Sequence, residues 1–399
     1  MAAGGGRMQR SAVLLGALVT VTLAVNYLIA FRGCGEPPSQ IPPGDPTRRV
    51  YLLTTWRSGS SLVGELFNQH PDVFYHFEPA WHAWQALYPG DAESLQGAVR
   101  DVLRGLYRCD LSVLQLYHPR PAKGGADEAL TTRDLFYASR NKVVCSRPQC
   151  PACHKDRVEM VNEDICKRDC PPQSLERLQA ECPKYGAVVI KGVRILDLGV
   201  LQPLIEELGL KVVHLVRDPR AVGSSRLRSR HGLIRENLQV LRRLHERRQP
   251  PVARLPPDLN AVGALEVLCA GLNRSLALAR RPPYRDNYLL LRFEDLLARP
   301  LHSLRRLYAF AGLRVTRELE GFLLGLSGGR RHNQSEPFAV SARDAGLVAS
   351  GWRGQLGMET VEKVQGFCGG AMRQLGYQMV KDRAQLLDMN VSLLSEPLV

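Results

Sequence analysis

The chain has 399 residues, of which 45% are hydrophobic and 23% charged, a composition typical of globular proteins and not of disordered chains. Its formal net charge is +14, which suits anionic partners such as nucleic acid, a membrane surface, a nucleotide or an acidic polysaccharide. Charge alone does not choose among these partners.

The first predicted element is a membrane anchor. The run from Ser11 to Phe31 contains no charged residue, and as a helix it is long enough to span roughly 30 Å of hydrocarbon. A cleaved signal peptide is the alternative, although the run is longer than the usual signal core and no clean small-x-small site follows it. Arg7 and Arg10 precede the run, which favours a cytosolic N-terminus and a type II orientation. We therefore expect a cytosolic tail (1–10), a transmembrane signal anchor (11–31), a stem (32–49) and a lumenal domain (50–399).

The lumenal domain is predicted to be α/β, with a parallel sheet and flanking helices. Short apolar runs alternate with helical patterns, the order expected when crossover helices connect parallel strands. The predicted strands are Val50–Leu53, Val73–Phe77, Ala187–Ile190, Leu210–Val216 and Tyr288–Leu291, and the predicted helices include Leu62–Asn68, Ser94–Tyr107, Leu196–Leu208 and Leu301–Ala311. Residues 119–130 are predicted to form a surface loop, and the basic stretch 226–254 is expected to be the least ordered part of the domain.

Ten cysteines agree with a lumenal address, because the oxidising secretory lumen permits disulfides. Six of them lie between Cys145 and Cys182, in a predicted insertion of residues 145–183. A zinc site is the alternative, since Cys150 and Cys153 form a C-x-x-C pair, but Cys166 and Cys170 are spaced more loosely than a second zinc knuckle. Disulfides are therefore favoured, with their pairing left open. Three sequons, at Asn273, Asn333 and Asn390, are predicted glycosylation sites.

A polar turn follows the first predicted strand, within the segment Thr54–Phe67. Ligands of α/β sheets bind beyond the carboxyl ends of the strands, where a helix start offers free N–H groups and partial positive charge. The residues Trp56-Arg57-Ser58-Gly59-Ser60-Ser61 add a guanidinium, hydroxyl donors and small side chains, which together suit a bound anion. The alternative is an ordinary Ser-Gly turn that caps a helix. Neither nucleotide-loop pattern, G-x-x-x-x-G-K-[ST] or G-x-G-x-x-G, is present, and the loop has no lysine or acidic magnesium ligand, so a metal-free anion site is expected.

A second basic turn follows the strand that ends at Val216. Asp218 is placed to cap the next helix and Pro219 to occupy its first position. Arg217 and Ser225 would then contact a second phosphate. Two anion sites at two strand ends suit a ligand with two separated phosphate groups.

These residues resemble the paired signatures of Golgi carbohydrate 6-O-sulfotransferases. The likeness extends to Glu65–Pro71, Phe77-Glu78-Pro79, Trp81-His82 and Arg292–Leu296, and it covers residues 49–377. The segments 88–92 and 229–233 look most like the N-acetylglucosamine branch, and the tail 376–394 looks more like chondroitin 6-O-sulfotransferases. The resemblance implies a P-loop-like sulfotransferase fold and the donor 3′-phosphoadenosine 5′-phosphosulfate. It implies that the 5′-phosphosulfate binds to Trp56, Arg57, Ser58, Gly59, Ser60, Ser61 and Leu62. It also implies that the 3′-phosphate binds to Arg217, Asp218, Pro219, Arg220, Ala221, Val222, Gly223, Ser224 and Ser225.

The expected reaction is attack of a C6 hydroxyl on sulfur in line with the leaving phosphate. Arg57, the serine hydroxyls and the helix N-terminus would stabilise charge on the leaving oxygen. Glu78 is the candidate base and His82 the second candidate. An internal salt bridge or a surface position is the alternative for Glu78, and packing or acceptor contact is the alternative for His82.

Several other residues have two interpretations. Lys191 and Arg194 would contact an acidic acceptor or remain solvated, and Arg292 and Glu294 are expected to form a structural turn. Trp352 with Arg353 would cover the nucleotide or belong to the core. The basic run 226–248 is a solvated face or, alternatively, a site for a sulfated or sialylated glycan.

The expected acceptor is N-acetylglucosamine in glycans, with GalNAc or galactose of chondroitin or keratan chains as the alternative. A membrane-anchored glycan-binding protein is the non-enzymatic alternative, but it does not explain two anion turns at strand ends. The D-x-D pattern typical of glycosyltransferases is not found. Expected partners are glycoproteins or proteoglycans and the Golgi membrane, with a homodimer possible and no nucleic acid.

Overall fold

The computed structural model describes residues 48–118, 130–151, 154, 156–246, 257–327 and 345–398. The chain divides into a unit of residues 1–46 and a compact unit of residues 47–399. The predicted tail, the predicted anchor and all but the last two residues of the predicted stem lie outside the described residues, as does the sequon at Asn333. The first strand begins at Arg48, so the folded domain starts two residues before its predicted boundary.

A five-stranded parallel sheet forms the centre of the larger unit, in the order β2-β3-β1-β4-β5. Its strands are β1 (Arg48–Leu53), β2 (Val73–Phe77), β3 (Ala187–Gly192), β4 (Lys211–Val216) and β5 (Tyr288–Arg292). All five strands were predicted, because each is a short apolar run buried on both faces. Side chains alternate between the faces: Tyr51 and Leu53 of β1 belong to one apolar cluster, and Val50 and Leu52 belong to the other.

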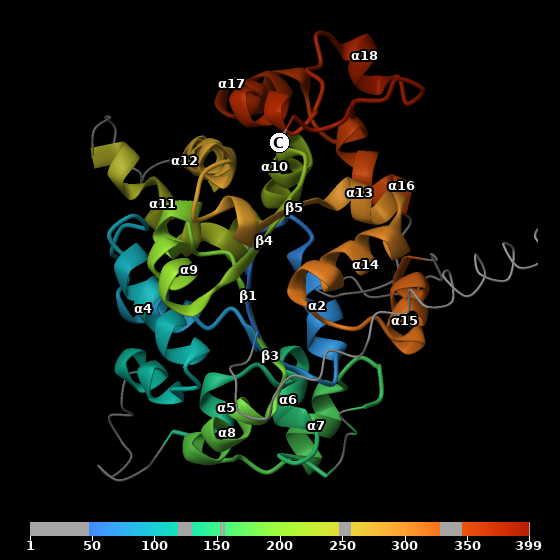
Figure 1. Cartoon of the computed structure of the whole chain (residues 1–399). Coiled ribbons are helices and arrows are strands. Elements are labelled where there is room, and N and C mark those ends of the chain that lie inside the picture. The colour runs from blue at the N-terminus through green and yellow to red at the C-terminus, as the bar shows by residue number, and fades with distance from the viewer. Residues whose placement is uncertain are drawn as a thin grey trace, which may run out of the picture. The chain divides into compact units, whose positions relative to one another are not determined.

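Helices cover both faces of this sheet (Figure 1). On one face lie α4 (Gln96–Tyr107), α9 (Gln202–Leu208) and α12 (Pro257–Ala279), and on the other lie α2 (Ser60–Gln69), α14 (Pro300–Ala311) and α15 (Arg317–Ser327). The longer helices that remain are α10 (Pro219–Arg228), α11 (Ile234–Glu246) and α17 (Met358–Gln374). The short ones are α3 (Trp81–Ala86), α5 (Thr132–Leu135), α6 (Lys142–Cys145), α7 (Glu163–Asp169), α8 (Leu175–Glu181), α13 (Phe293–Ala298), α16 (Ala345–Ser350) and α18 (Arg383–Leu387).

The expectation that residues 226–254 would be poorly ordered is wrong for residues 226–246. This segment contains the end of α10, a short 3-10 turn (Arg230–Leu233) and the whole of α11. The sequence looked disordered because it is rich in arginine, yet Leu233, Val240 and Leu241 are buried on one side of the segment and anchor it to the core. Residues 247–254 lie outside the described part of the chain.

One described helix, α12, contains a span from Asn260 to Ala279 that is long and apolar enough to cross a membrane by length and composition. Half of that span is buried inside the domain, and a disulfide from Cys269 to Cys368 ties it to α17. These contacts indicate a core helix of the folded domain.

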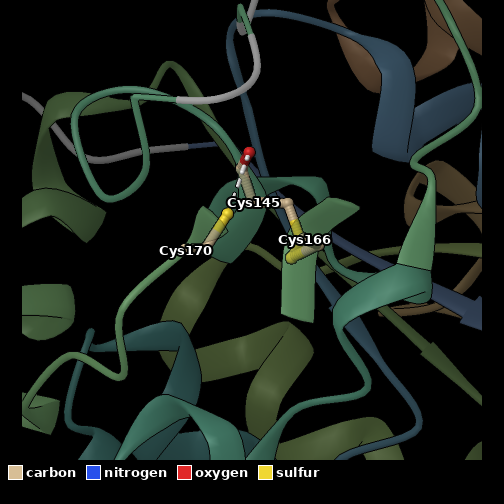
Figure 2. A group of neighbouring side chains, drawn as sticks. All are labelled: Cys145, Cys166 and Cys170. Carbon is tan, nitrogen blue, oxygen red and sulfur yellow. Dashed lines mark hydrogen bonds between the residues drawn. A yellow bond between two sulfur atoms is a disulfide. The ribbon is translucent and has the colours of Figure 1, made fainter. Parts of the chain in front are cut away.

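Eight of the cysteines form four disulfides, which confirms the disulfide prediction for these residues. The pairs are Cys109–Cys182, Cys145–Cys166, Cys150–Cys170 and Cys269–Cys368. The sulfur atoms of Cys145, Cys166 and Cys170 lie within 4.8 Å of one another. Figure 2 shows these neighbouring side chains. All three are already bonded to another sulfur, so they are not available as thiolate ligands, and the disulfide interpretation is favoured over zinc. Cys34 and Cys153 lie outside the described residues.

Candidate active site

The two predicted anion turns lie side by side at the carboxyl edge of the sheet. The first turn connects β1 to α2 and the second connects β4 to α10, and β1 pairs directly with β4. Parallel pairing brings the carboxyl ends of neighbouring strands to the same edge, so residues far apart in sequence meet there.

The first turn has an unusual backbone. Arg57 has a φ of 74° and Gly59 a φ of 88°, both in the left-handed region. A Cβ atom on Gly59 would lie 2.2 Å from the ring of Phe293, so only glycine fits there. The hydroxyl of Ser58 donates to the carbonyl oxygen of Thr55 at 2.9 Å, which fixes the turn. Strain held in this way at a strand end is typical of a functional site.

The second turn has the cap that was predicted for it. The Asp218 carboxylate accepts a hydrogen bond from the backbone N–H of Arg220, and Pro219 occupies the first turn of α10. The Arg220 guanidinium is fully buried, pairs with Asp218 at 2.7 Å and lies 4.5 Å from the ring centre of Trp352. Arg220 therefore stabilises the second turn through its buried ion pair with Asp218. Ser224 donates to the side-chain oxygen of Gln355 at 2.8 Å.

Direct hydrogen bonds connect the two turns. Nε of Arg57 donates to Oγ of Ser225 at 2.9 Å, and Nη1 of Arg217 donates to the carbonyl oxygen of Arg57 at 3.0 Å. Nη2 of Arg217 donates to the carbonyl oxygen of Val348 at 2.6 Å. Both turns thus share one hydrogen-bond network, although 160 residues separate Arg57 from Arg217.

Two buried donors at this junction have no hydrogen-bond partner among the described residues. They are Nε of Arg217 and the hydroxyl of Thr54. Burial lowers the pKa of Arg217 from its ordinary value, although Glu294 and Asp218 offset part of that effect. Both residues line a pocket whose other walls come from Thr55, Ser58, Val216, Leu265, Leu268 and Leu272. Buried donors without a partner, in residues that line a pocket, are candidates for contact with a bound anion.

Glu294 holds the second turn in place. Its Oε1 accepts the backbone N–H of Asp218 at 3.0 Å, and its Oε2 accepts the hydroxyl of Tyr377 at 2.8 Å. The neighbouring Arg292 pairs with Asp295 and donates to the carbonyl oxygens of Leu375 and Ser395. These contacts agree with the expected structural turn, and they also tie the C-terminal segment to the anion site. No sequence pattern had indicated that connection.

Glu78 lies in an ion-pair cluster. Its φ is 48°, its Oε1 pairs with Nζ of Lys191, and its Oε2 accepts Nη1 of Arg194 at 2.6 Å. Burial alone would raise the pKa of Glu78, but the charges of Lys191 and Arg194 outweigh it and lower the pKa to about 2. The Arg194 guanidinium also lies 5.4 Å from the ring centre of Trp56, next to the first turn. Lys191 and Arg194 are therefore buried partners of Glu78, which contradicts the second of their two interpretations, that they remain solvated.

The remaining candidates have packing contacts. His82 is buried, its Nε2 lies 3.0 Å from the carbonyl oxygen of Leu135, and burial lowers its pKa from the ordinary value. The Arg353 guanidinium is buried and donates to four carbonyl oxygens, those of Gln385, Leu386, Asp388 and Val391. Trp352 is buried beneath Arg220, so the core interpretation is favoured for Trp352 and Arg353.

Two sequons lie in described segments. Asn273 is half-buried inside α12, where its Oδ1 accepts a hydrogen bond from Gln374 at 3.4 Å, and Ser275 of the same sequon is buried. Asn390 is exposed after α18. Asn390 is therefore open to solvent, whereas Asn273 is partly covered by its contact with Gln374.

Comparison with known proteins gives a family match that includes both turns. A family model described as "Sulfotransferase domain" matches residues 47–376. Mouse carbohydrate sulfotransferase 2 is 48% identical over 89% of this chain and 69% of its own length, and mouse carbohydrate sulfotransferase 7 is 49% identical over 83% and 74%. Human carbohydrate sulfotransferase 6 is 38% identical over 91% of this chain and 89% of its own length.

Proposed function

Because the chain belongs to the sulfotransferase family, as a carbohydrate sulfotransferase, we propose that it transfers sulfate from 3′-phosphoadenosine 5′-phosphosulfate to the C6 hydroxyl of N-acetylglucosamine in glycans. We place this activity in the Golgi lumen, behind a type II anchor of residues 11–31. The single observation that supports the donor best is the hydrogen-bonded pair of anion turns, in which Arg57 contacts Ser225.

The donor has two anionic ends, and each turn would bind one of them. The first turn combines the guanidinium of Arg57, the Ser58–Ser61 hydroxyls and the N-terminus of α2, which suits the phosphosulfate. The second turn offers the unpaired Nε of Arg217 and the N-terminus of α10, which suits the 3′-phosphate. The remaining residues of the two turns, from Trp56 to Leu62 and from Asp218 to Ser225, would shape these two sites.

The proposed reaction is an in-line displacement at sulfur. The acceptor oxygen O6 forms a bond to sulfur while the bond from sulfur to the 5′-phosphate oxygen breaks, and adenosine 3′,5′-bisphosphate leaves. Arg57 and the N–H groups of the first turn stabilise the charge that develops on the leaving oxygen. Pre-alignment of the two substrates supplies the other large contribution to the rate.

We keep Glu78 as the proposed acceptor of the O6 proton. It follows the end of β2 and its partner Arg194 contacts Trp56 of the first turn, so its position supports the assignment. Its low pKa keeps it ionised but makes it a weak base. The competing role is an internal salt bridge, and Glu78→Gln separates the two. Loss of turnover with unchanged bisphosphate binding supports a base, whereas turnover that survives contradicts it.

The decisive experiment is transfer of radiolabelled sulfate from the donor to N-acetylglucosamine-terminated, keratan and chondroitin acceptors. Label on C6 of N-acetylglucosamine is the expected result. Label on GalNAc or galactose would change the proposed acceptor and leave the donor intact. Glycan binding without transfer, and without saturable binding of adenosine 3′,5′-bisphosphate, would contradict the proposed function.

A further inference from the structure

An exposed patch lies where the end of α3 meets the start of α11. Leu87, Tyr88 and Ile234 are each 40% exposed, and Arg235 is exposed beside them. We call these four residues the α3–α11 rim. Large apolar side chains that gather on a surface together with a cation indicate a binding surface more often than isolated exposed residues do.

Side-chain contacts hold the rim in a fixed shape. The Arg235 guanidinium lies 5.5 Å from the ring centre of Tyr88, and its Nη1 donates to Oε1 of Gln85 at 3.2 Å. One turn further along α11, Gln239 donates to the carbonyl oxygen of Trp84 at 3.2 Å. Arg235 contacts no carboxylate among the described residues, so its charge is available to a ligand. A surface that is ordered before binding loses little entropy when a ligand binds.

Buried side-chain contacts through Arg194 connect the rim to the candidate active site. The guanidinium of Arg194 holds Glu78 at 2.6 Å and lies 5.7 Å from the ring centre of Trp84, which belongs to α3. Its Nη2 lies 3.8 Å from Oε1 of Glu236, the residue that follows Arg235 in α11. The same buried arginine therefore contacts the first turn, Glu78 and both helices of the rim.

These contacts suit one kind of ligand, a sugar residue with an acidic substituent. The aromatic face of Tyr88 matches the apolar C–H face of a pyranose ring, and its hydroxyl remains in water. The guanidinium of Arg235 has the geometry to pair with a sulfate or a carboxylate while it stays against the ring.

We propose that the α3–α11 rim is an acceptor subsite, which binds a sulfated sugar of the same glycan at a distance from the hydroxyl that receives sulfate. The proposal rests on the proposed function and adds to it a preference for acceptors that already have an acidic group. It gives Tyr88 and Arg235 a role in choosing the acceptor and no role in the chemical step.

The test compares three acceptors that present the same terminal N-acetylglucosamine. They are its methyl glycoside, a neutral tetrasaccharide, and the same tetrasaccharide with one internal sulfate. The variants are Tyr88→Ala and Arg235→Gln, with Tyr88→Phe retaining the ring. Arg305→Gln is the matched control, because Arg305 is an exposed arginine of α14 that pairs with Glu320.

Arg235→Gln is expected to raise KM for the sulfated tetrasaccharide about five- to tenfold and to leave the neutral one nearly unchanged. Tyr88→Ala is expected to raise KM for both tetrasaccharides. Tyr88→Phe, which keeps the ring, is expected to have the same KM values as the unmodified protein. The methyl glycoside and the donor should keep their kinetic constants in every variant.

Unchanged KM values for the sulfated tetrasaccharide in both variants would overturn the subsite. An equal increase for the methyl glycoside would overturn it too, because the change would then lie at the transfer site. Absence of transfer to all three acceptors by the unmodified protein is a different result, which would contradict the proposed function itself.

Discussion

Arg57 donates a hydrogen bond to the hydroxyl of Ser225 at 2.9 Å, and this bond joins two turns that lie 168 residues apart in sequence. Ser225 therefore positions the guanidinium of Arg57, whatever it contacts in the ligand. The bond also means that a change in one turn should alter the other.

Ser225→Ala should weaken binding of adenosine 3′,5′-bisphosphate roughly ten- to a hundredfold, since a hydrogen bond to a charged group contributes about 1.5 to 3 kcal/mol. Isothermal titration calorimetry measures the dissociation constant directly. Ser303→Ala serves as the control, because Ser303 is also buried but lies in α14, where its hydroxyl donates to the carbonyl oxygen of Asp295. Equal affinities for the two variants would show that the link has no part in binding.

Gly59→Ala should destabilise the domain and abolish donor binding. The φ of 88° costs an L-residue roughly 1 kcal/mol, and the new Cβ would overlap the ring of Phe293. Gly366→Ala in α17 is the matched control, since that position is exposed with open space around it and alanine favours helix. Thermal unfolding should show a lower Tm for the first variant and an equal or higher Tm for the second. A Gly59 variant that keeps its Tm and its ligand would contradict the steric argument.

The strands and both turns were predictable because their signals are local. Buried parallel strands are short apolar runs, and Asp218 with Pro219 forms a cap that can be recognised within four residues. The environment of Glu78 is not local. It depends on the register that pairs Phe77 of β2 with Lys191 of β3, so the lysine meets the residue after the strand. Sequence spacing does not reveal the register that brings Lys191 to Glu78, 113 residues away.

The prediction that residues 226–246 are poorly ordered was wrong for a different reason. Its arginines dominate the composition, and composition suggested a solvated segment. Val240 and Leu241 of α11 are nevertheless buried in a core formed by residues distant in sequence. Tertiary burial of a few residues therefore outweighed the average polarity of the segment.

Lys191→Met should move the acid limb of the pH profile of kcat/KM to higher pH. In the folded protein the pKa of Glu78 is lowered from 4.5 to about 2. The ion pairs of Glu78 therefore contribute their full stability above pH 4.5, and this stability is lost as the pH falls from 4.5 toward 2. Removing Lys191 removes the largest opposing charge, so burial then raises the pKa of Glu78. If Glu78 accepts the proton, kcat/KM of the variant should begin to fall at a higher pH than that of the unmodified protein.

Lys184→Met is the control for that profile, because Lys184 is exposed and pairs with Glu181 away from the site. Its profile should match that of the unmodified protein. An active Lys191 variant whose profile is also unchanged would argue that Glu78 has only a structural role.

The disulfide between Cys269 and Cys368 should stabilise the domain more than any other single link between helices. It joins α12 to α17 across 99 residues, and closing so long a loop restricts the unfolded chain strongly. Replacing both cysteines by alanine should lower the free energy of unfolding by about 2 to 4 kcal/mol. Urea denaturation measures this loss, and the Cys150–Cys170 pair, which spans 20 residues, should cost less when replaced. A larger cost for the shorter loop would contradict the loop-length argument.

Tyr377→Phe should weaken donor binding although Tyr377 does not belong to either turn. Its hydroxyl donates to Oε2 of Glu294, whose Oε1 accepts the backbone N–H of Asp218. Loss of the hydroxyl leaves a buried carboxylate with one partner fewer, and burial already raises the pKa of Glu294. Protonation of Glu294 would then weaken its bond to the second turn. We therefore expect KM for the donor to rise about three- to tenfold, with kcat and KM for the acceptor nearly unchanged. Tyr284→Phe tests the same loss of a hydroxyl at Gln202, away from the turns, and should leave all constants unaltered. A Tyr377 variant with a lower Tm but an unchanged KM for the donor would show that Glu294 contributes to stability and not to donor binding.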